Sequence, residues 1–429
     1  MSFTRAGAAG SATSEKVWSG DPTPTCGIRS DRGRGTFFEG MPDVSTSHPV
    51  HVVDTGSDHD DPRTPEAGMA LSLSGGGYRA MLFHLGSLWR LNELGCLKGL
   101  KRISSVSGGS ITAAMLGLKW SKLGFGANDV GANYVSEVVT PIRALAGTTI
   151  DQAAILGGIF TPGSVSDKVT RAYRDHLFQH ATLQDLPDDL SGPRFVINAT
   201  SVQTGALFRF SRPYIADYHV GRVLNPRVEL AVAVAASSAF PPILSPCTIE
   251  FDPASWVASG TEDLHRVPYT SRVVLSDGGV YDNLGLETTW KRYDTILVSN
   301  GGGKMAPEES PHADWARHAI RINDIIDNQV RSLRARQVID SFKSGLRKGS
   351  YWGIRTDIAD YGVGGALPCP LAQTTVLAAT PTRLKELPAV TQERLINWGY
   401  AVCDAGMRKH VVTTAPAPAN FPYPESAVG

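Results

Sequence analysis

The sequence predicts an α/β fold built around a mainly parallel sheet, and the pattern of residues 69–123 is the first reason. An apolar alternation from Met69 stops at three glycines, and a helical stripe of leucines then runs from Tyr78 to Gly95. A second strand is expected over residues 100–106, and a second helix over 111–123. Strand, helix, strand and helix in close succession form a βαβ unit with a further helix, which predicts parallel strands.

Three later segments supply the second reason. Residues 194–199, 272–276 and 295–299 are β-branched and are followed by polar or glycine turns, as buried parallel strands tend to be. Between the second helix and Arg194 we expect a mainly helical insertion that includes residues 165–178. A long amphipathic stretch over 315–346 follows the last strand. The run 230–236 (LAVAVAA) fits either a buried strand or the start of a helix.

Composition limits the function classes. The chain has 429 residues with 41 Lys+Arg against 41 Asp+Glu, so no net charge would attract nucleic acid. We find no apolar stretch of the roughly 18–20 residues needed to span a membrane and no signal-peptide pattern, and we expect a cytoplasmic protein. The five cysteines are scattered, which argues against a disulfide framework and a zinc knuckle.

The same survey divides the chain into three parts. Residues 1–66 are rich in Gly, Ser, Thr, Pro and Asp and are expected to form a disordered or loosely packed arm. The folded domain is expected over 67–410. Residues 411–429 form a Pro/Ala-rich tail, which by composition is a linker or loose end.

A glycine-rich turn follows the first strand, in the segment Ser74-Gly75-Gly76-Gly77-Tyr78-Arg79-Ala80. Glycines allow a ligand to approach the backbone N–H groups, and the N-terminus of the following helix favours negative charge. The segment therefore predicts an anion-binding turn. It lacks the spacing of a dinucleotide site or a P-loop, and a tight turn without a ligand is the simpler alternative.

The second strand ends in Ser105-Val-Ser107-Gly108-Gly109-Ser110, which approximates the nucleophile elbow G-x-S-x-G with Ser107 in the middle. A helix-capping turn is the simpler interpretation of these residues alone. Gly76 and Ser107 are 31 residues apart, however, which is the length of one βαβ unit. Both turns should then meet at the carboxyl edge of the sheet, where Gly76, Gly77 and Gly108 could stabilise an oxyanion above Ser107.

A serine nucleophile needs a base. Asp277 follows a predicted strand in Ser276-Asp277-Gly-Gly, and should lie at the same edge. A histidine is the commoner base, and His312, His318 and His410 follow Asp277 in the order of a Ser–Asp–His triad. None of the three lies at a strand end, and His84 is expected to pack inside the protein.

These three motifs, SGGGYRA, SVSGGS and SDGG, resemble those of the patatin-like phospholipases, and SGGGYRA also resembles the group-IV cytosolic phospholipases. Weaker similarity at residues 198–205 and 237–242 extends the resemblance over most of 67–410. The resemblance implies a three-layer α/β/α fold with helical insertions. It also implies that the protein cleaves acyl esters of lipids by a Ser107–Asp277 dyad, without a cofactor or metal. It makes Gly75, Gly76 and Gly77 the oxyanion loop, with Gly108 beside them, and Arg79 a contact for substrate phosphate, although a structural salt bridge is equally consistent. Ser105 replaces the glycine that usually begins the serine motif.

The resemblance also implies a phospholipid or other acyl-lipid substrate and contact with a membrane surface. A basic amphipathic helix over 315–348 could provide that contact, but a helix that faces the core is the simpler interpretation. Residues 300–304 (NGGGK) are expected to form a loop near the sheet edge. Two other functions stay open: an esterase with a Ser–Asp–His triad, and a non-catalytic sensor that binds an anionic ligand at the glycine turns. The sequence does not indicate the oligomeric state.

Overall fold

A computed structural model of the chain describes residues 65–150, 164–303 and 305–429. The predicted arm over 1–66 lies outside the described residues except for its last two. The strands are β1 (Glu66–Leu73), β2 (Leu100–Val106), β3 (Arg194–Ser201), β4 (Leu207–Phe210), β5 (Tyr214–Asp217), β6 (Gly221–Leu224), β7 (Cys247–Glu250), β8 (Trp256–Val257), β9 (Arg272–Asp277), β10 (Tyr293–Asn300) and β11 (Lys348–Gly353).

The helices include the two that were predicted to follow the first and second strands. They are α1 (Gly77–Glu93), α2 (Gly108–Leu118), α3 (Thr140–Ala146), α5 (Val165–Tyr173), α6 (Leu230–Ser237), α7 (Gly279–Asp282), α8 (Glu287–Trp290), α9 (Trp315–Lys343), α10 (Leu371–Ala378) and α11 (Ala389–His410). The apolar run 230–236 is thus helical. The expected helix over 165–178 begins as α5 and continues into a short π-helical turn.

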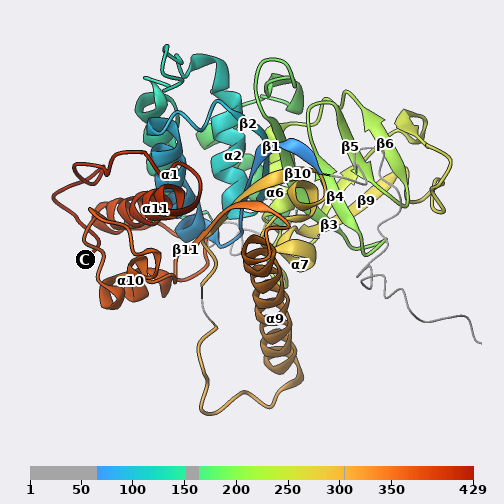
Figure 1. Cartoon of the computed structure of the whole chain (residues 1–429). Helices are drawn as coiled ribbons and strands as arrows, with labels where there is room; N and C mark the ends of the chain where they lie inside the picture. The colour runs from blue at the N-terminus through green and yellow to red at the C-terminus, as the bar shows by residue number, and fades with distance from the viewer. Residues whose placement is uncertain (1–64, 151–163, 304) are drawn as a thin grey trace, which may run out of the picture. The chain divides into compact units, whose positions relative to one another are not determined.

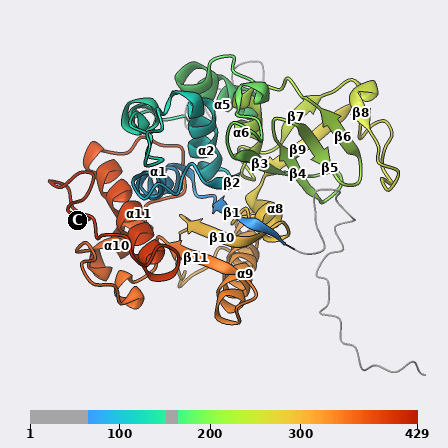
Figure 2. The ribbon, with the colours of Figure 1, turned by 45° about the horizontal axis from the view of Figure 1, so that its top comes forward.

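The strands of the described residues form one sheet in the order β11-β10-β1-β2-β3-β4-β5-β6-β8. The first five of these are parallel, which confirms the mainly parallel core, and β4, β5, β6 and β8 continue it as an antiparallel extension. Strands β7 and β9 lie off this path, with β9 paired to β3 and β7 paired to β9. Figure 2 shows this extension on the side of β3 away from β1. In the register of β1 and β2, Leu73 lies opposite Ser105, so the turns that follow these two strands are neighbours.

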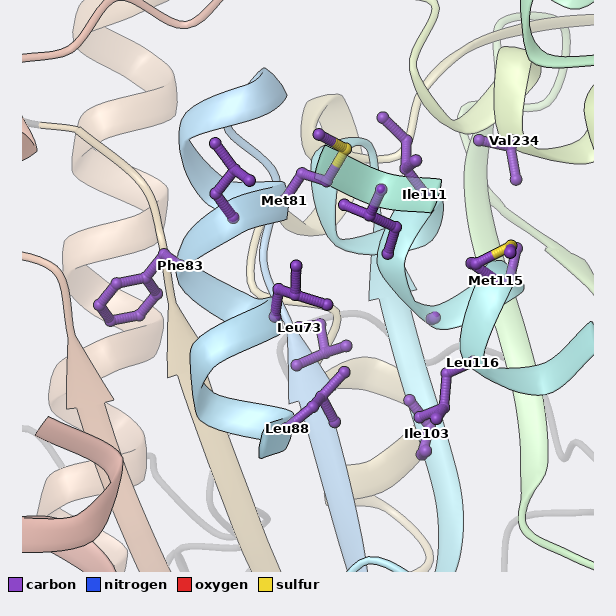
Figure 3. Close-up of a cluster of buried hydrophobic side chains, with 14 of the residues drawn as sticks. Leu73, Met81, Phe83, Leu88, Ile103, Ile111, Met115, Leu116 and Val234 are labelled. Carbon is purple, nitrogen blue, oxygen red and sulfur yellow. The ribbon is translucent and has the colours of Figure 1, made fainter. Parts of the chain in front are cut away.

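Helices cover both faces of the parallel strands. On one face, α1 and α2 pack their apolar side chains against β1 and β2, as Figure 3 shows for Leu73, Met81, Ile103 and Met115. On the other face, Ile296 and Val298 of β10 pack with Val338 of α9 and with the residues before α8. The structure therefore has the three α/β/α layers that were expected.

Strand β9 corrects one expectation. Its β-branched residues suggested another parallel strand, but β9 pairs antiparallel with β3, with Asp277 opposite Ala199. Strand β2 ends one position earlier on the same side of β3, with Val106 opposite Asn198. The carboxyl ends of β2 and β9 therefore meet head-on along β3.

Helix α9 divides into two parts. Its C-terminal half packs against the sheet through Val338, as a core-facing helix should. Its N-terminal half extends away from the sheet (Figure 1), and Trp315 and Ile326 there are 86% and 52% exposed. Within the described residues, no helix is both long and apolar enough to cross a membrane.

The C-terminal segment differs from the loose end that its composition predicts. The Asn397 side chain of α11 donates to the carbonyls of Tyr423 and Ala427, both at 2.7 Å, and accepts from the Tyr423 N–H. Phe421 and Val428 are buried. A remote asparagine thus supplies hydrogen bonds that this irregular backbone cannot make internally.

Candidate active site

Ser107 lies on a strained turn between β2 and α2. Its φ is 52° and its ψ is −119°, a backbone conformation that residues other than glycine rarely adopt. The Ser107 N–H donates to Ser237 Oγ at 2.9 Å, and Ser237 Oγ in turn donates to the Asn198 carbonyl at 2.6 Å. The turn is therefore braced from the neighbouring helix α6, and the Ser107 side chain is directed by a fixed backbone.

The two glycine turns touch, as the length of the βαβ unit predicts. A Cβ atom on Gly108 would lie 2.2 Å from the Gly77 carbonyl oxygen, and one on Gly109 would lie 2.6 Å from the Leu73 carbonyl oxygen. Neither position has room for a side chain. Ser105, which replaces the usual glycine, is buried and fits because its Oγ donates to the Val196 carbonyl.

The glycine turn after β1 leads directly into α1. Gly76 and Gly77 have φ values of 142° and 60°, which only glycine adopts without strain. The Gly75 N–H is already bound, because it donates to both the backbone oxygen and the side-chain Oδ1 of Asn283 at 3.0 and 3.1 Å. Within the described part of the chain, we find no acceptor for the N–H groups of Gly76 and Gly77. These two groups lie at the positive end of the α1 dipole.

His84 braces this turn from inside the protein. Its Nε2 donates to the Ser74 carbonyl at 2.9 Å, and its Nδ1 lies 2.8 Å from Ser299 Oγ. Burial, with a smaller contribution from the positive charge of Arg79, lowers the pKa of His84 to about 4, although the hydrogen bond to Ser74 opposes this change. His84 is therefore a neutral packing residue, as expected.

Asp277 ends β9 and is buried, with 2% of its surface exposed. Its Oδ1 accepts the Gly279 N–H at 2.7 Å, whereas no described residue donates a hydrogen bond to its Oδ2. Burial raises the pKa of Asp277 to about 7; the Gly279 N–H and the Ser107 side chain oppose this rise, and Asp327 adds to it. A carboxylate with this pKa can accept and return a proton near neutral pH.

The predicted residues share one cavity of about 640 Å³. Gly75, Gly76, Gly77, Arg79, Ser107 and Asp277 line it, and Gly108 lies behind them against Gly77. None of the histidines in the described ranges lines this cavity. His312 lies in the loop before α9, His318 lies in α9, and His410 ends α11. Apolar side chains form part of its wall, namely Phe240, Ile243, Leu244, Met305 and Ile320.

Arg79 brings a positive charge into the cavity wall. Its guanidinium donates to the Gly301 carbonyl at 3.0 Å and to the Thr380 carbonyl, and it forms no ion pair with any described acidic residue. Burial, together with the positive charges of Arg331 and Arg355, lowers the pKa of Arg79 to about 10. Arg79 therefore stays charged at neutral pH, and the hydrogen bonds that it makes within the described residues go to backbone carbonyls.

The sequence did not reveal several residues that complete the site. Asn283 resembles an ordinary turn residue, yet it binds Gly75 and lines the cavity. Gly302 and Gly303 also line the cavity, as the predicted loop near the sheet edge allows, while Lys304 lies outside the described residues. From α9 the wall includes Ile320, Arg321, Asp324, Asp327, Asn328 and Arg331. Their spacing of three and four residues marks one face of a helix, but no local pattern shows what that face meets.

The sequence profile described as patatin-like phospholipase matches residues 71–290, which is more than half of the chain. The chain belongs to the patatin-like phospholipase family. The match includes all three motifs, together with both residues that the resemblance assigned to the dyad. The description of this family names a phospholipase activity. No curated protein sequence is a significant match.

Solved structures similar to this patatin-like chain include human GIVD cytosolic phospholipase A2, with 12% sequence identity and a TM-score of 0.44. That similarity covers 78% of this chain and 58% of the human chain, so this chain spans little more than half of that protein. VipD from Legionella pneumophila has 16% identity and a TM-score of 0.31, with 79% of this chain and 66% of VipD covered. The type III effector protein ExoU has 20% identity and a TM-score of 0.22, with 42% and 41% covered.

Proposed function

We propose that this patatin-like chain hydrolyses acyl esters of phospholipids or related lipids through a Ser107–Asp277 dyad. One observation carries the proposal: the strained serine and a buried carboxylate with a pKa of about 7 line the same cavity. Asp277 Oδ2 has no described partner and is the atom that would take the Ser107 proton. The serine oxygen would then attack the ester carbonyl carbon.

The glycine turn supplies the second part of the proposed mechanism. The N–H groups of Gly76 and Gly77 would donate to the oxyanion that forms on the former carbonyl oxygen, aided by the α1 dipole. Gly108 would allow the two turns to pack closely, because it contacts Gly77 without a side chain between them. Gly75 would hold the glycine turn in place through its hydrogen bonds to Asn283. Collapse of the tetrahedral intermediate passes the proton from Asp277 to the leaving alcohol. Water, deprotonated by Asp277, then releases the fatty acid from the acyl-serine.

The cavity wall supports a lipid with an anionic head group. Arg79 would bind phosphate, since its charge has no acidic partner among the described residues. The apolar wall would hold the acyl chain. At the cavity rim, Phe240 and Ile243 are 46% and 51% exposed, which supports action at a lipid surface.

The decisive experiment is fatty-acid release from mixed phospholipid vesicles by the wild type, Ser107→Ala and Asp277→Asn. Release that both substitutions abolish, in folded proteins, would support the dyad. If the vesicles are not cleaved, labelling of Ser107 by a fluorophosphonate probe would identify an enzyme whose serine is reactive but which lacks an activator. Absence of both release and labelling would overturn the proposal and leave a ligand-binding role for the glycine turns.

A further inference from the structure

Asn283 contacts the glycine turn with both its backbone and its side chain. The Gly75 N–H donates to Asn283 O at 3.0 Å and to Asn283 Oδ1 at 3.1 Å. A Cβ atom on Gly75 would lie 2.4 Å from this Oδ1 and 3.3 Å from the Ser107 Cβ. Gly75 therefore lies between Asn283 and Ser107, and only a glycine fits at this position.

The same side chain lies beside the base and reaches helix α9. A Cβ atom on Gly279, whose N–H binds Asp277, would lie 3.1 Å from Asn283 Oδ1. On its other side, Asn283 Nδ2 donates to Asp327 Oδ1 of α9 at 3.4 Å. One amide thus bonds to the glycine turn and to α9, and it lies against Gly279 beside Asp277.

We propose that Asn283 is a positioning residue that holds the Gly75–Gly77 turn against Ser107 and, through Asp327, fastens both to α9. This inference rests on the proposed function, because it concerns the same reaction. Asp327 has a second effect, since its negative charge disfavours the charged form of Asp277 and raises the pKa of that carboxyl.

Four groups from different elements lie near Asp277. Asp327 approaches from α9, the Ser107 hydroxyl from the turn before α2, and the Gly279 N–H from the start of α7. Tyr173 of α5 lies close enough for the Asp277 charge to raise its pKa, in addition to the larger effect of burial, so it stays neutral near pH 7. Of the four, only Asp327 carries a charge like that of Asp277, and its removal should be visible in a pH profile.

The test uses the full-length chain and p-nitrophenyl butyrate, a soluble ester that makes lipid docking irrelevant. We would measure kcat and KM from pH 5 to 9 for the wild type, Asn283→Ala, Asn283→Asp and Asp327→Asn. Asp340→Asn is the matched control, because it removes an exposed charge from the same helix outside the cavity. Thermal melting checks that each variant is folded.

We expect Asn283→Ala to lower kcat on the order of 10–100-fold with little change in KM, because the turn loses one of its two fastenings. Asn283→Asp keeps an acceptor for the Gly75 N–H and should recover most of this loss at high pH, while its added charge moves the acid limb of the profile to higher pH. Asp327→Asn should move that limb to lower pH, and Asp340→Asn should leave it in place.

Two results would overturn the inference while the wild type is active: a kcat of Asn283→Ala within twofold of wild type, or an acid limb that Asp327→Asn does not move. If the wild type neither cleaves the ester nor reacts with a fluorophosphonate, the proposed function fails and this inference with it. If it reacts without turnover, the pH dependence of the labelling rate replaces kcat in the same comparison.

Discussion

The contact between the two glycine turns makes Gly108→Ala an informative perturbation. Its new Cβ atom would lie 2.2 Å from the Gly77 carbonyl oxygen and 3.0 Å from the Gly77 nitrogen, and both obstacles are backbone atoms. Relief of the closer contact requires the turns to separate by about 1 Å, and a displacement of that size at a reacting centre costs about 10²-fold in rate. Overpacking should also destabilise the fold by about 1–3 kcal/mol.

We would measure kcat on p-nitrophenyl butyrate at pH 8, together with the melting temperature. Gly364→Ala is the matched control, because a Cβ atom there meets no atom within 4 Å and the variant should behave like the wild type. A folded Gly108→Ala protein with a kcat within threefold of wild type would refute the reasoning, since catalysis would then not depend on the spacing between Ser107 and the oxyanion donors.

Four further outcomes are expected. Hydrolysis should rise with pH through about 7, because Asp277 must be deprotonated to act as a base; a flat profile between pH 5 and 9 would contradict this. Asp277→Asn should abolish activity and raise the melting temperature at pH 8 but not at pH 4, because a raised folded-state pKa costs stability above the unfolded value of 3.8, by at most about 4 kcal/mol. His312→Ala, His318→Ala and His410→Ala should each keep kcat within twofold on the soluble ester, and loss in any of them would favour a triad. Arg79→Gln should weaken turnover of phospholipid more than turnover of an uncharged ester, and equal losses would assign it a structural role.

The first half of the site could be predicted because its information is local. In residues 69–123 the spacing of apolar residues changes twice from that of a strand to that of a helix, and glycines mark both turns. Such patterns determine where strands end, and parallel pairing of neighbouring strands then brings Gly76 beside Ser107. The same reasoning found Asp277 at a strand end.

The remaining features depend on contacts that no local pattern encodes. β-Branched residues report that a strand is buried, but they do not report its direction, so the antiparallel pairing of β9 was not foreseen. Asn283 has the composition of a turn residue, and its role arises only when Gly75, 208 positions earlier, meets it. The C-terminal segment likewise packs because Asn397 supplies hydrogen bonds from another element.

The direction of β9 explains how a fold with its serine at one strand end can place a buried base beside it. Val106 and Asp277 pair with consecutive residues of β3, Asn198 and Ala199, so one strand backbone sets the spacing of the two ends. A Cβ atom on Gly278 would lie 2.4 Å from the Asn198 carbonyl oxygen, which shows how closely the second end abuts the first. A carboxylate is made more basic by removal from water, but it then needs its proton donor at a fixed position, because solvent cannot relay the proton. A shared strand meets that need better than two mobile loops would, and the antiparallel pairing is therefore the feature that lets Asp277 be both buried and reachable from Ser107.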